Sequence, residues 1–303
     1  MSTRTVYISM IITAFFWSGA FIAGKLAATI FLPFTLTFFR FLFALPFIFF
    51  LLWFKEPAKF IPNKEQLLPL LILGIVGTLG YHFFFFLALR HTTAINSALI
   101  GATNPMVTIV LAALFFKEKI TLVRLVGVGV SLFGVFSVIT NLDPLVISTM
   151  QFNQGDFYMS LGVFCFSSYA LLSRKYMLKF KISPLTVTAY TFLVCTVLSL
   201  VLGLLLENPL GTVLQAPSKV WLEILYMAVF ASVVGYYLQL NAIREIGAPK
   251  TAMFINLVPV FTIFLAFTFL GEDISLLKIG CATLIIFGVY LASRPEKIPV
   301  EGQ

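Results

Sequence analysis

Residues 88–135 read ALRHTTAINSALIGATNPMVTIVLAALFFKEKITLVRLVGVGVSLFGV, and residues 242–289, 154 positions later, read AIREIGAPKTAMFINLVPVFTIFLAFTFLGEDISLLKIGCATLIIFGV. At this constant offset many residues recur unchanged, among them Ala88, Arg90, Ala94, Pro105, Thr108, Ile109, Glu118, Phe133, Gly134 and Val135. Earlier in the chain the offset slips to 151, where Pro33, Thr35, Thr37, Phe41 and Leu42 recur as Pro184, Thr186, Thr188, Phe192 and Leu193. We therefore expect two copies of one unit, at residues 5–140 and 154–293.

The composition places these units in a membrane. Of the 303 residues, 60% are hydrophobic and only 11% are charged, and the mean hydropathy is +1.03. A soluble globular domain carries roughly 25% charged residues, because water must solvate its surface. The composition thus excludes a soluble fold and makes the lipid bilayer the main partner of the surface.

Ten apolar stretches, separated by short polar or Pro/Gly breaks, predict an all-α membrane protein with ten transmembrane helices. A spanning helix needs about 20 apolar residues, whereas a spanning strand needs only about 9–11 and alternates in hydrophobicity. The predicted spans are Thr5–Gly24, Pro33–Phe54, Leu67–Leu89, Ala94–Phe116, Thr121–Thr140, Gln154–Ser173, Pro184–Leu206, Val220–Ala242, Ala248–Leu270 and Ser275–Ser293. Because each unit holds five helices, an odd number, the second unit must enter the membrane inverted relative to the first.

The basic residues predict the orientation, because short cytoplasmic loops carry an excess of Lys and Arg. Fifteen of the 20 fall on the side of the N-terminus: Arg4, Lys55, Lys59, Lys64, Lys117, Lys119, Arg124, Arg174, Lys175, Lys179, Lys181, Arg244, Lys250, Arg294 and Lys297. Four fall on the other side: Lys25, Arg90, Lys219 and Lys278. We expect a multi-pass protein of the cytoplasmic membrane with both termini cytoplasmic. The net charge of +8 is then a topology signal and requires no nucleic acid partner.

Several motifs resemble the EamA-type branch of the drug/metabolite transporter superfamily. They are Phe16-Trp17-Ser18 followed by Gly24-Lys25, Arg40-Phe41, and the repeated line Ala88, Leu89, Arg90, Ala94, Pro105, Glu118, Gly134 and Val135. The resemblance covers almost the whole chain. It implies a ten-helix secondary transporter, often an exporter of amino acids or related metabolites. It also implies a central cavity between helices 1–4 and 6–9, with helices 5 and 10 at the periphery.

Two prolines interrupt the fourth and ninth predicted spans at matching repeat positions. Pro105 and Pro259 each remove a backbone hydrogen bond, so each helix can kink and expose polar backbone where a cavity re-satisfies it. The amides of Asn104 and Asn256 lie beside these kinks. Capping of the disrupted backbone and contact with a substrate both remain open for them.

The other candidate substrate-binding residues are aromatic or polar groups at membrane depth. His82, with Tyr81 beside it, lies inside the third span, where an imidazole binds a carboxylate, relays a proton or only bonds a neighbouring helix. Tyr236 and Gln239 occupy the equivalent region of the eighth span. Trp17 and Tyr169 lie at comparable depths in the first and sixth spans, as expected of an aromatic wall for an organic solute.

Some charged residues lie in or near the predicted spans, and Arg40 has two interpretations. Arg40, inside the second span, binds a substrate anion or else bonds helix carbonyls and snorkels. Glu118 and Glu272 precede the fifth and tenth spans, where we expect them to complement the positive N-terminal dipoles of those helices. The three cysteines, Cys165, Cys195 and Cys281, lie in apolar stretches without metal-ligand spacing, so we expect no metal and no cofactor.

The sequence thus favours a secondary transporter of small organic metabolites, amino acids or related compounds, that works as an exporter by alternating access. The segment Gly19–Leu26 imitates a phosphate-binding loop, but it ends in Leu and lies in a membrane helix, which disfavours an ATP-driven pump. A passive channel or facilitator is the alternative. An intramembrane enzyme is another, although HExxH and GxSxG motifs are missing from the sequence. We expect the protein to act as a monomer or a homodimer.

Overall fold

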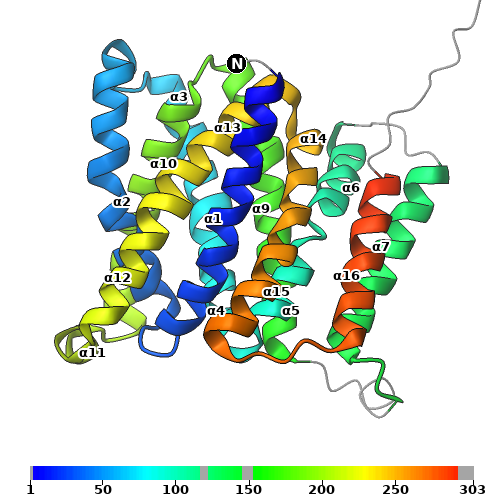
Figure 1. Cartoon of the computed structure of the whole chain (residues 1–303). Coiled ribbons are helices and arrows are strands. Elements are labelled where there is room, and N and C mark those ends of the chain that lie inside the picture. The colour runs from blue at the N-terminus through cyan, green and yellow to red at the C-terminus, as the bar shows by residue number, and fades with distance from the viewer. Residues whose placement is uncertain (1–2, 117–121, 145–152, 293–303) are drawn as a thin grey trace, which may run out of the picture.

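A computed structural model describes residues 3–116, 122–144 and 153–292, and in these ranges every regular element is a helix (Figure 1). The first half contains α1 Thr3–Ala27, α2 Pro33–Lys55, η1 Pro57–Lys59, α3 Lys64–Ile72, η2 Leu73–Leu79, α4 Gly80–His91, α5 Ala94–Gly101, α6 Asn104–Phe116 and α7 Leu122–Thr140. The second contains α9 Gln154–Lys179, α10 Pro184–Leu206, α11 Leu210–Gln215, α12 Ser218–Tyr226, η3 Met227–Val234, α13 Gly235–Ile246, α14 Ala248–Ala252, η4 Met253–Asn256, α15 Leu257–Leu270 and α16 Leu276–Ala292.

Seven helical stretches in the described residues are long and apolar enough to cross a membrane. They are Arg4–Ala27, Pro33–Lys55, Lys64–His91, Ala94–Phe115, Pro184–Leu206, Ser218–Ile246 and Lys250–Leu270. Helices α7 and α16 hold shorter apolar segments, Leu125–Thr140 and Leu276–Leu291. Helix α9 has 26 residues and polar residues at both ends.

The distribution of side chains is that of a protein solvated by lipid. Large apolar side chains such as Phe54 (70% exposed) and Phe264 (68%) cover the outside, whereas Arg40 and His82 are buried inside. An exposed apolar surface of this extent would drive a soluble protein to aggregate, but it matches hydrocarbon.

Helices at matching positions of the two halves pack against one another. Helix α2 packs on α10, and α7 packs on α16 at one edge of the molecule, while α1 packs on α13 and α15 in the way that α9 packs on α4 and α6 (Figure 1). At the α7–α16 crossing, Gly134 approaches Ile285 and Gly288 approaches the backbone of Ser131. These two contacts are equivalent under the offset of 154 residues, so the crossing is nearly symmetric.

The first helices of the two halves run in opposite directions. Lys25, near the end of α1, donates to the carbonyl of Thr92 (2.8 Å), and the Thr92 hydroxyl donates to Asp156 Oδ1 (2.6 Å) at the start of α9. The end of α1 and the start of α9 therefore lie on the same face of the molecule. We call this the opposite face, which carries residues 28–32, 92–93, 207–217 and 271–275. The N-face is the other one, where α1 begins and where α2 connects to α3.

Each half also contains a π-helical segment, which the residue pattern does not predict. Segment η2 begins at Leu73 and η3 at Met227, again 154 residues apart. Each is continuous with α-helix on both sides and leads into a glycine, Gly80 or Gly235. In a π segment each N–H group bonds the carbonyl five residues earlier, where an α-helix uses four, so a backbone carbonyl is left for other donors; such segments are frequent at functional sites.

Candidate functional site

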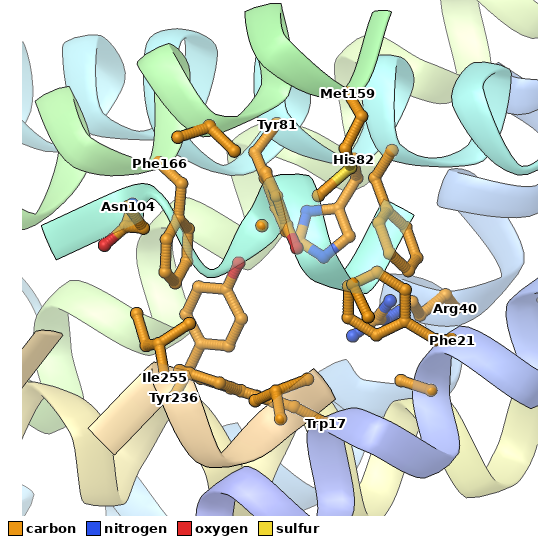
Figure 2. Close-up of a pocket in the computed structure, with 16 residues that line it drawn as sticks. Trp17, Phe21, Arg40, Tyr81, His82, Asn104, Met159, Phe166, Tyr236 and Ile255 are labelled. Atoms are coloured by element: carbon orange, nitrogen blue, oxygen red, sulfur yellow. The ribbon is translucent and has the colours of Figure 1, made fainter. Parts of the chain in front are cut away.

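A cavity lies between the two halves, and both contribute to its wall (Figure 2). Its lining comes from α1 (Trp17, Ala20, Phe21), α2 (Arg40), α4 (Tyr81, His82, Phe85), α5 and α6 (Ala98, Gly101, Asn104), α9 (Met159, Val163, Phe166), α13 (Tyr236), η4 (Ile255) and α15 (Val258). The cavity volume is about 40 Å³, which is room for a few water molecules, since one water occupies roughly 10–15 Å³ on this measure. A small solute therefore fits only if some lining side chains move.

Aromatic rings form most of the wall. The Phe166 ring lies 4.7 Å from Tyr81 and 5.7 Å from Trp17, measured between centroids, and Tyr236 lies 5.9 Å from His82. These rings come from four helices of both halves. Mostly apolar walls with a few converging polar groups are typical of sites for small organic molecules.

Both π segments are bonded by an aromatic N–H group of the wall. The indole nitrogen of Trp17 donates to the carbonyl of Ala231 in η3 at 3.0 Å. In η2, the ring nitrogen Nδ1 of His82 lies 2.7 Å from the carbonyl of Thr78. A carbonyl only accepts, so Nδ1 carries a proton and the Nε2 of a neutral His82 is an acceptor. Among the described residues, His82 Nε2 has no hydrogen-bond partner.

Arg40 presents a buried positive charge to the same space (Figure 2). The side chain is 3% exposed, its Nε donates to Ser232 Oγ at 2.8 Å, and its Nη1 contacts the Met227 sulfur at 4.0 Å. The guanidinium carbon lies 5.7 Å from the Phe41 ring centroid and 5.8 Å from that of Phe86.

These contacts compensate the charge of Arg40 only in part. Cation–π contacts contribute about 0.5–2 kcal/mol each, whereas removing a charge from water costs several kcal/mol. Within the described part of the chain, no carboxylate forms an ion pair with the guanidinium. The described residues therefore provide no counter-ion for this buried cation.

Both proline-containing spans are broken beside the cavity. Two turn residues, Ala102 and Thr103, interrupt the α-helix between α5 and α6, and Pro105 is the second residue of α6. In the other half, a 3₁₀ turn, η4, separates α14 from α15, and Pro259 is the third residue of α15. Asn104 donates from Nδ2 to Ser167 Oγ at 2.8 Å, and the Ser167 hydroxyl reaches the Asn104 carbonyl at 3.2 Å. The pair thus connects the broken span to α9.

Five of the eight residues proposed from the sequence to bind substrate line the cavity: Trp17, Tyr81, His82, Asn104 and Tyr236. Tyr169 is buried behind the wall, 5.9 Å from the Tyr236 ring. Gln239 and Asn256 are buried but do not line the cavity. Arg40 also lines the cavity, and its Nε donates to the Ser232 hydroxyl; anion binding and helix bonding both stay predictions for it. The apolar lining residues Phe21, Phe85 and Met159 carry no signal that separates them from ordinary core.

On the opposite face, two carboxylates of the second half cap helices of the first. Glu207, which follows α10, accepts from the backbone N–H groups of Phe34 (2.8 Å) and Thr35 (2.7 Å) at the start of α2. Glu272, which follows α15, accepts from the N–H groups of Ala94 (2.7 Å) and Ile95 (3.0 Å) at the start of α5. The expectation that Glu272 serves the helix after it was wrong, because its carboxylate crosses to the other half. Glu118 lies outside the described residues.

Two basic residues reinforce that face within the first half. Lys25 Nζ donates to the carbonyls of Leu89 (2.7 Å) and Thr92 (2.8 Å), and Arg90 Nη1 donates to the carbonyl of Ala28 (2.7 Å). Cations at helix C-termini satisfy the last carbonyls and the negative end of the dipole. On the opposite face, therefore, carboxylates bond the N-terminal ends of helices and basic side chains bond the C-terminal ends.

Comparison with known proteins agrees with this fold. Residues 4–140 and 153–294 each match the EamA-like transporter family. An uncharacterized transporter of Bacillus subtilis, YyaM, is 32% identical over 299 residues, which are 99% of this chain and 97% of the relative. An uncharacterized transporter of Archaeoglobus fulgidus is 30% identical over 98% of this chain and 99% of its own length.

More distant proteins also match over almost the whole length of this chain. The protein PagO of Salmonella typhimurium is 22% identical over 99% of this chain and 96% of its own. A crystal structure with 18% identity superposes with a TM-score of 0.66 over 96% of this chain and 97% of that one, which shows a common fold. With two family matches that cover both halves, the chain belongs to the EamA-like transporter family and is a multi-pass membrane protein of a transporter type.

Proposed function

We propose that this protein is a secondary transporter that exports small organic metabolites, amino acids or related compounds, across the cytoplasmic membrane. In this proposal the chain spans the bilayer ten times as two inverted five-helix units, and both termini are cytoplasmic. The substrate binds in the central cavity, where Trp17, Tyr81, His82, Asn104 and Tyr236 contact it, while Tyr169, Gln239 and Asn256 join the site when the helices move. Pro105 and Pro259 mark the hinges.

The observation that carries the proposal is a small cavity whose wall comes from both halves. Because α1 and α9 run in opposite directions, the two halves can exchange roles by rocking about the cavity. A solute bound between them would then face one side of the membrane at a time. Such a movement needs no continuous pore, and the cavity volume of about 40 Å³ fits a solute site that closes around its contents.

In this proposal the two capping carboxylates stabilise one of the two conformations between which the transporter alternates. Glu207 and Glu272 connect the halves on the opposite face, and we assign this arrangement to the state in which that face is closed. Glu56 stands 151 residues before Glu207, the offset at which Thr35 and Thr186 match. Here Glu56 directly follows α2, with its Oε2 3.7 Å from Lys59 Nζ, while Ser183 caps α10 instead. In the alternative state, Glu56 would take over the start of α10 and close the N-face.

Counterflow in proteoliposomes tests the proposal. Vesicles are loaded with an unlabelled amino acid, and entry of the same labelled compound is followed over a panel of amino acids and related metabolites. A transporter of this kind shows saturable uptake that internal substrate accelerates. Uptake that rises linearly with concentration and ignores the internal solute would identify a passive channel and contradict alternating access. Chemical conversion of the solute would identify an enzyme.

A further inference from the structure

We propose that the transported molecule carries a carboxylate, which binds to Arg40, and that its apolar remainder packs against the aromatic wall. This inference rests on the proposed function and names the substrate class of the same cavity. It is carried by the uncompensated charge of Arg40, by the direction of its free donors and by the surroundings of His82.

The contacts of Arg40 determine which edge of its guanidinium is available. Ser232 occupies the Nε donor at 2.8 Å, and the weak contact with the Met227 sulfur is 4.0 Å long. Both partners lie in η3, so this π segment fixes the guanidinium plane. The Nη1–Nη2 edge is left, and two parallel N–H groups on that edge match the two oxygens of a carboxylate.

None of the described residues that line the cavity carries a carboxylate that could neutralise Arg40. Among the lining residues, the titratable groups other than Arg40 are Tyr81, His82 and Tyr236, and carboxylates are missing from the wall. In a membrane interior, a cation is expected to pair or to mark the path of an anion. Because the pairing partner is not among the described residues, we assign it to the substrate.

His82 offers the same substrate a second contact. Its Nε2 and the hydroxyl of Tyr236 lack hydrogen-bond partners among the described residues, and in Figure 2 the Tyr236, His82 and Arg40 side chains converge on one space. The acceptor Nε2 suits an N–H or O–H group next to the carboxylate, such as the ammonium of an amino acid. A carboxylic acid without an amine would use Arg40 alone.

A matched ligand series tests the proposal on the purified full-length protein. Leucine, 4-methylpentanoate and 3-methylbutylamine share one branched apolar body and differ in whether they carry a carboxylate, an ammonium or both. Thermal unfolding is measured with each compound, and acetate, butanoate and 3-phenylpropanoate vary the size of the acid. We expect at least one carboxylate to raise Tm in a saturable way and the amine to leave Tm unchanged. A stronger shift with leucine than with 4-methylpentanoate would add the contact with His82.

Variants of Arg40 decide whether that residue causes the Tm shift produced by the carboxylates. Arg40→Gln should abolish the shift, and Arg40→Lys, which keeps the charge without the fork, should weaken binding about tenfold. Arg244→Gln is the matched control, because Arg244 is an exposed arginine on the N-face, and it should retain the full shift. If Arg40→Gln does not fold, as its Tm without ligand will show, Arg40→Lys carries the test.

The proposal is overturned if none of the acids shifts Tm, if the amine shifts it equally, or if an Arg40 variant that folds binds the acids as tightly as the unchanged protein. Exchange across proteoliposomes separates this failure from a failure of the proposed function. Exchange of 3-methylbutylamine without exchange of the acids would leave a transporter and remove Arg40 as the anion site. Binding of the acids without exchange would keep the Arg40 site and remove transport.

Discussion

His82 has two ring nitrogens with different surroundings, and each can be removed separately. Nδ1 bonds the Thr78 carbonyl at 2.7 Å, whereas Nε2 has no partner among the described residues. In His82→Asn, the amide nitrogen can replace Nδ1 and keep the bond to η2, but nothing replaces Nε2. We expect transport in vesicles to fall about tenfold or more, since one hydrogen bond contributes roughly 1–1.5 kcal/mol and 1.4 kcal/mol is a factor of ten.

His82→Ala removes both nitrogens and should also lose most transport, with a lower Tm because the Thr78 carbonyl loses its donor. Comparison of the two variants separates the contribution to folding from the contribution to transport. Unchanged uptake kinetics in His82→Asn would remove Nε2 from the site.

The sequence could identify an individual residue of the site only where the chemistry of its side chain contrasts with its surroundings. A histidine, an arginine or an asparagine in an apolar span is conspicuous, and His82, Asn104 and Arg40 do line the cavity. Phe21 and Phe85 line it too, but they cannot be told from the other phenylalanines, of which the chain has 35. Gln239 has the right chemistry and lies one turn too far along α13, because depth along a helix is estimated only from uncertain span boundaries.

The π segments depend on close contact between helices, which makes their glycines sensitive. A methyl group on Gly77 would overlap the ring of Tyr169 on α9. We expect Gly77→Ala to lower Tm clearly, because overpacking costs about 1–3 kcal/mol. Gly129→Ala on α7 is the control, since nothing lies within 4 Å of its added methyl group, and alanine is the better helix former. Equal Tm values for the two variants would contradict the packing seen at η2.

The repeat predicted the elements better than it predicted their hydrogen bonds. Starts such as Pro33, Pro184, Ala94 and Ala248 follow from proline and loop signals together with the offset. The π segments do not, because Leu, Gly, Val and Ser occur equally in ordinary membrane helices, and a residue pattern does not show that carbonyls in these segments accept from Trp17 and His82. Glu272 shows the same limit: its partner Ala94 lies 178 residues away, where local sequence patterns do not reach.

The carboxylate caps predict a measurable shift between states. A carboxylate that accepts two N–H bonds at a helix N-terminus contributes about 0.3–2 kcal/mol. Replacement of Glu207 by Gln leaves one accepting oxygen and removes the charge, so the opposite face should open more often. A cysteine introduced at Ala98, a buried lining residue, should then react several-fold faster with a membrane-impermeant thiol reagent added from that face.

Glu56→Gln provides the opposing test. If Glu56 caps α10 when the N-face is closed, this change should slow labelling of the same cysteine from the opposite face. Asp273→Asn is the control: Asp273 is exposed, follows Glu272 directly and loses the same charge, yet it should leave the rate unchanged. Equal effects of Glu207→Gln and Glu56→Gln would show that charge alone, and not the caps, controls access.

The structure shows a larger difference in free basic charge between the two faces than the sequence indicated. Of the four basic residues placed on the opposite face, Lys25 and Arg90 donate to helix-end carbonyls. Basic residues that serve helix ends contribute less as free loop charges. The remaining bias, with residues such as Lys59 and Lys64 exposed on the N-face, is therefore larger than a simple count indicates.

The proposed orientation then predicts which face a reagent reaches in intact cells. Ala58 and Gln215 are exposed residues on the N-face and the opposite face, and each is replaced by cysteine in turn. The native thiols give little background, because Cys195 and Cys281 are buried and Cys165 is half-buried. An impermeant maleimide should label Gln215→Cys from outside the cell, and Ala58→Cys only after the membrane is opened. The reverse pattern would place the N-face outside, and a transporter with the same cavity would then have to be assigned the inverted orientation.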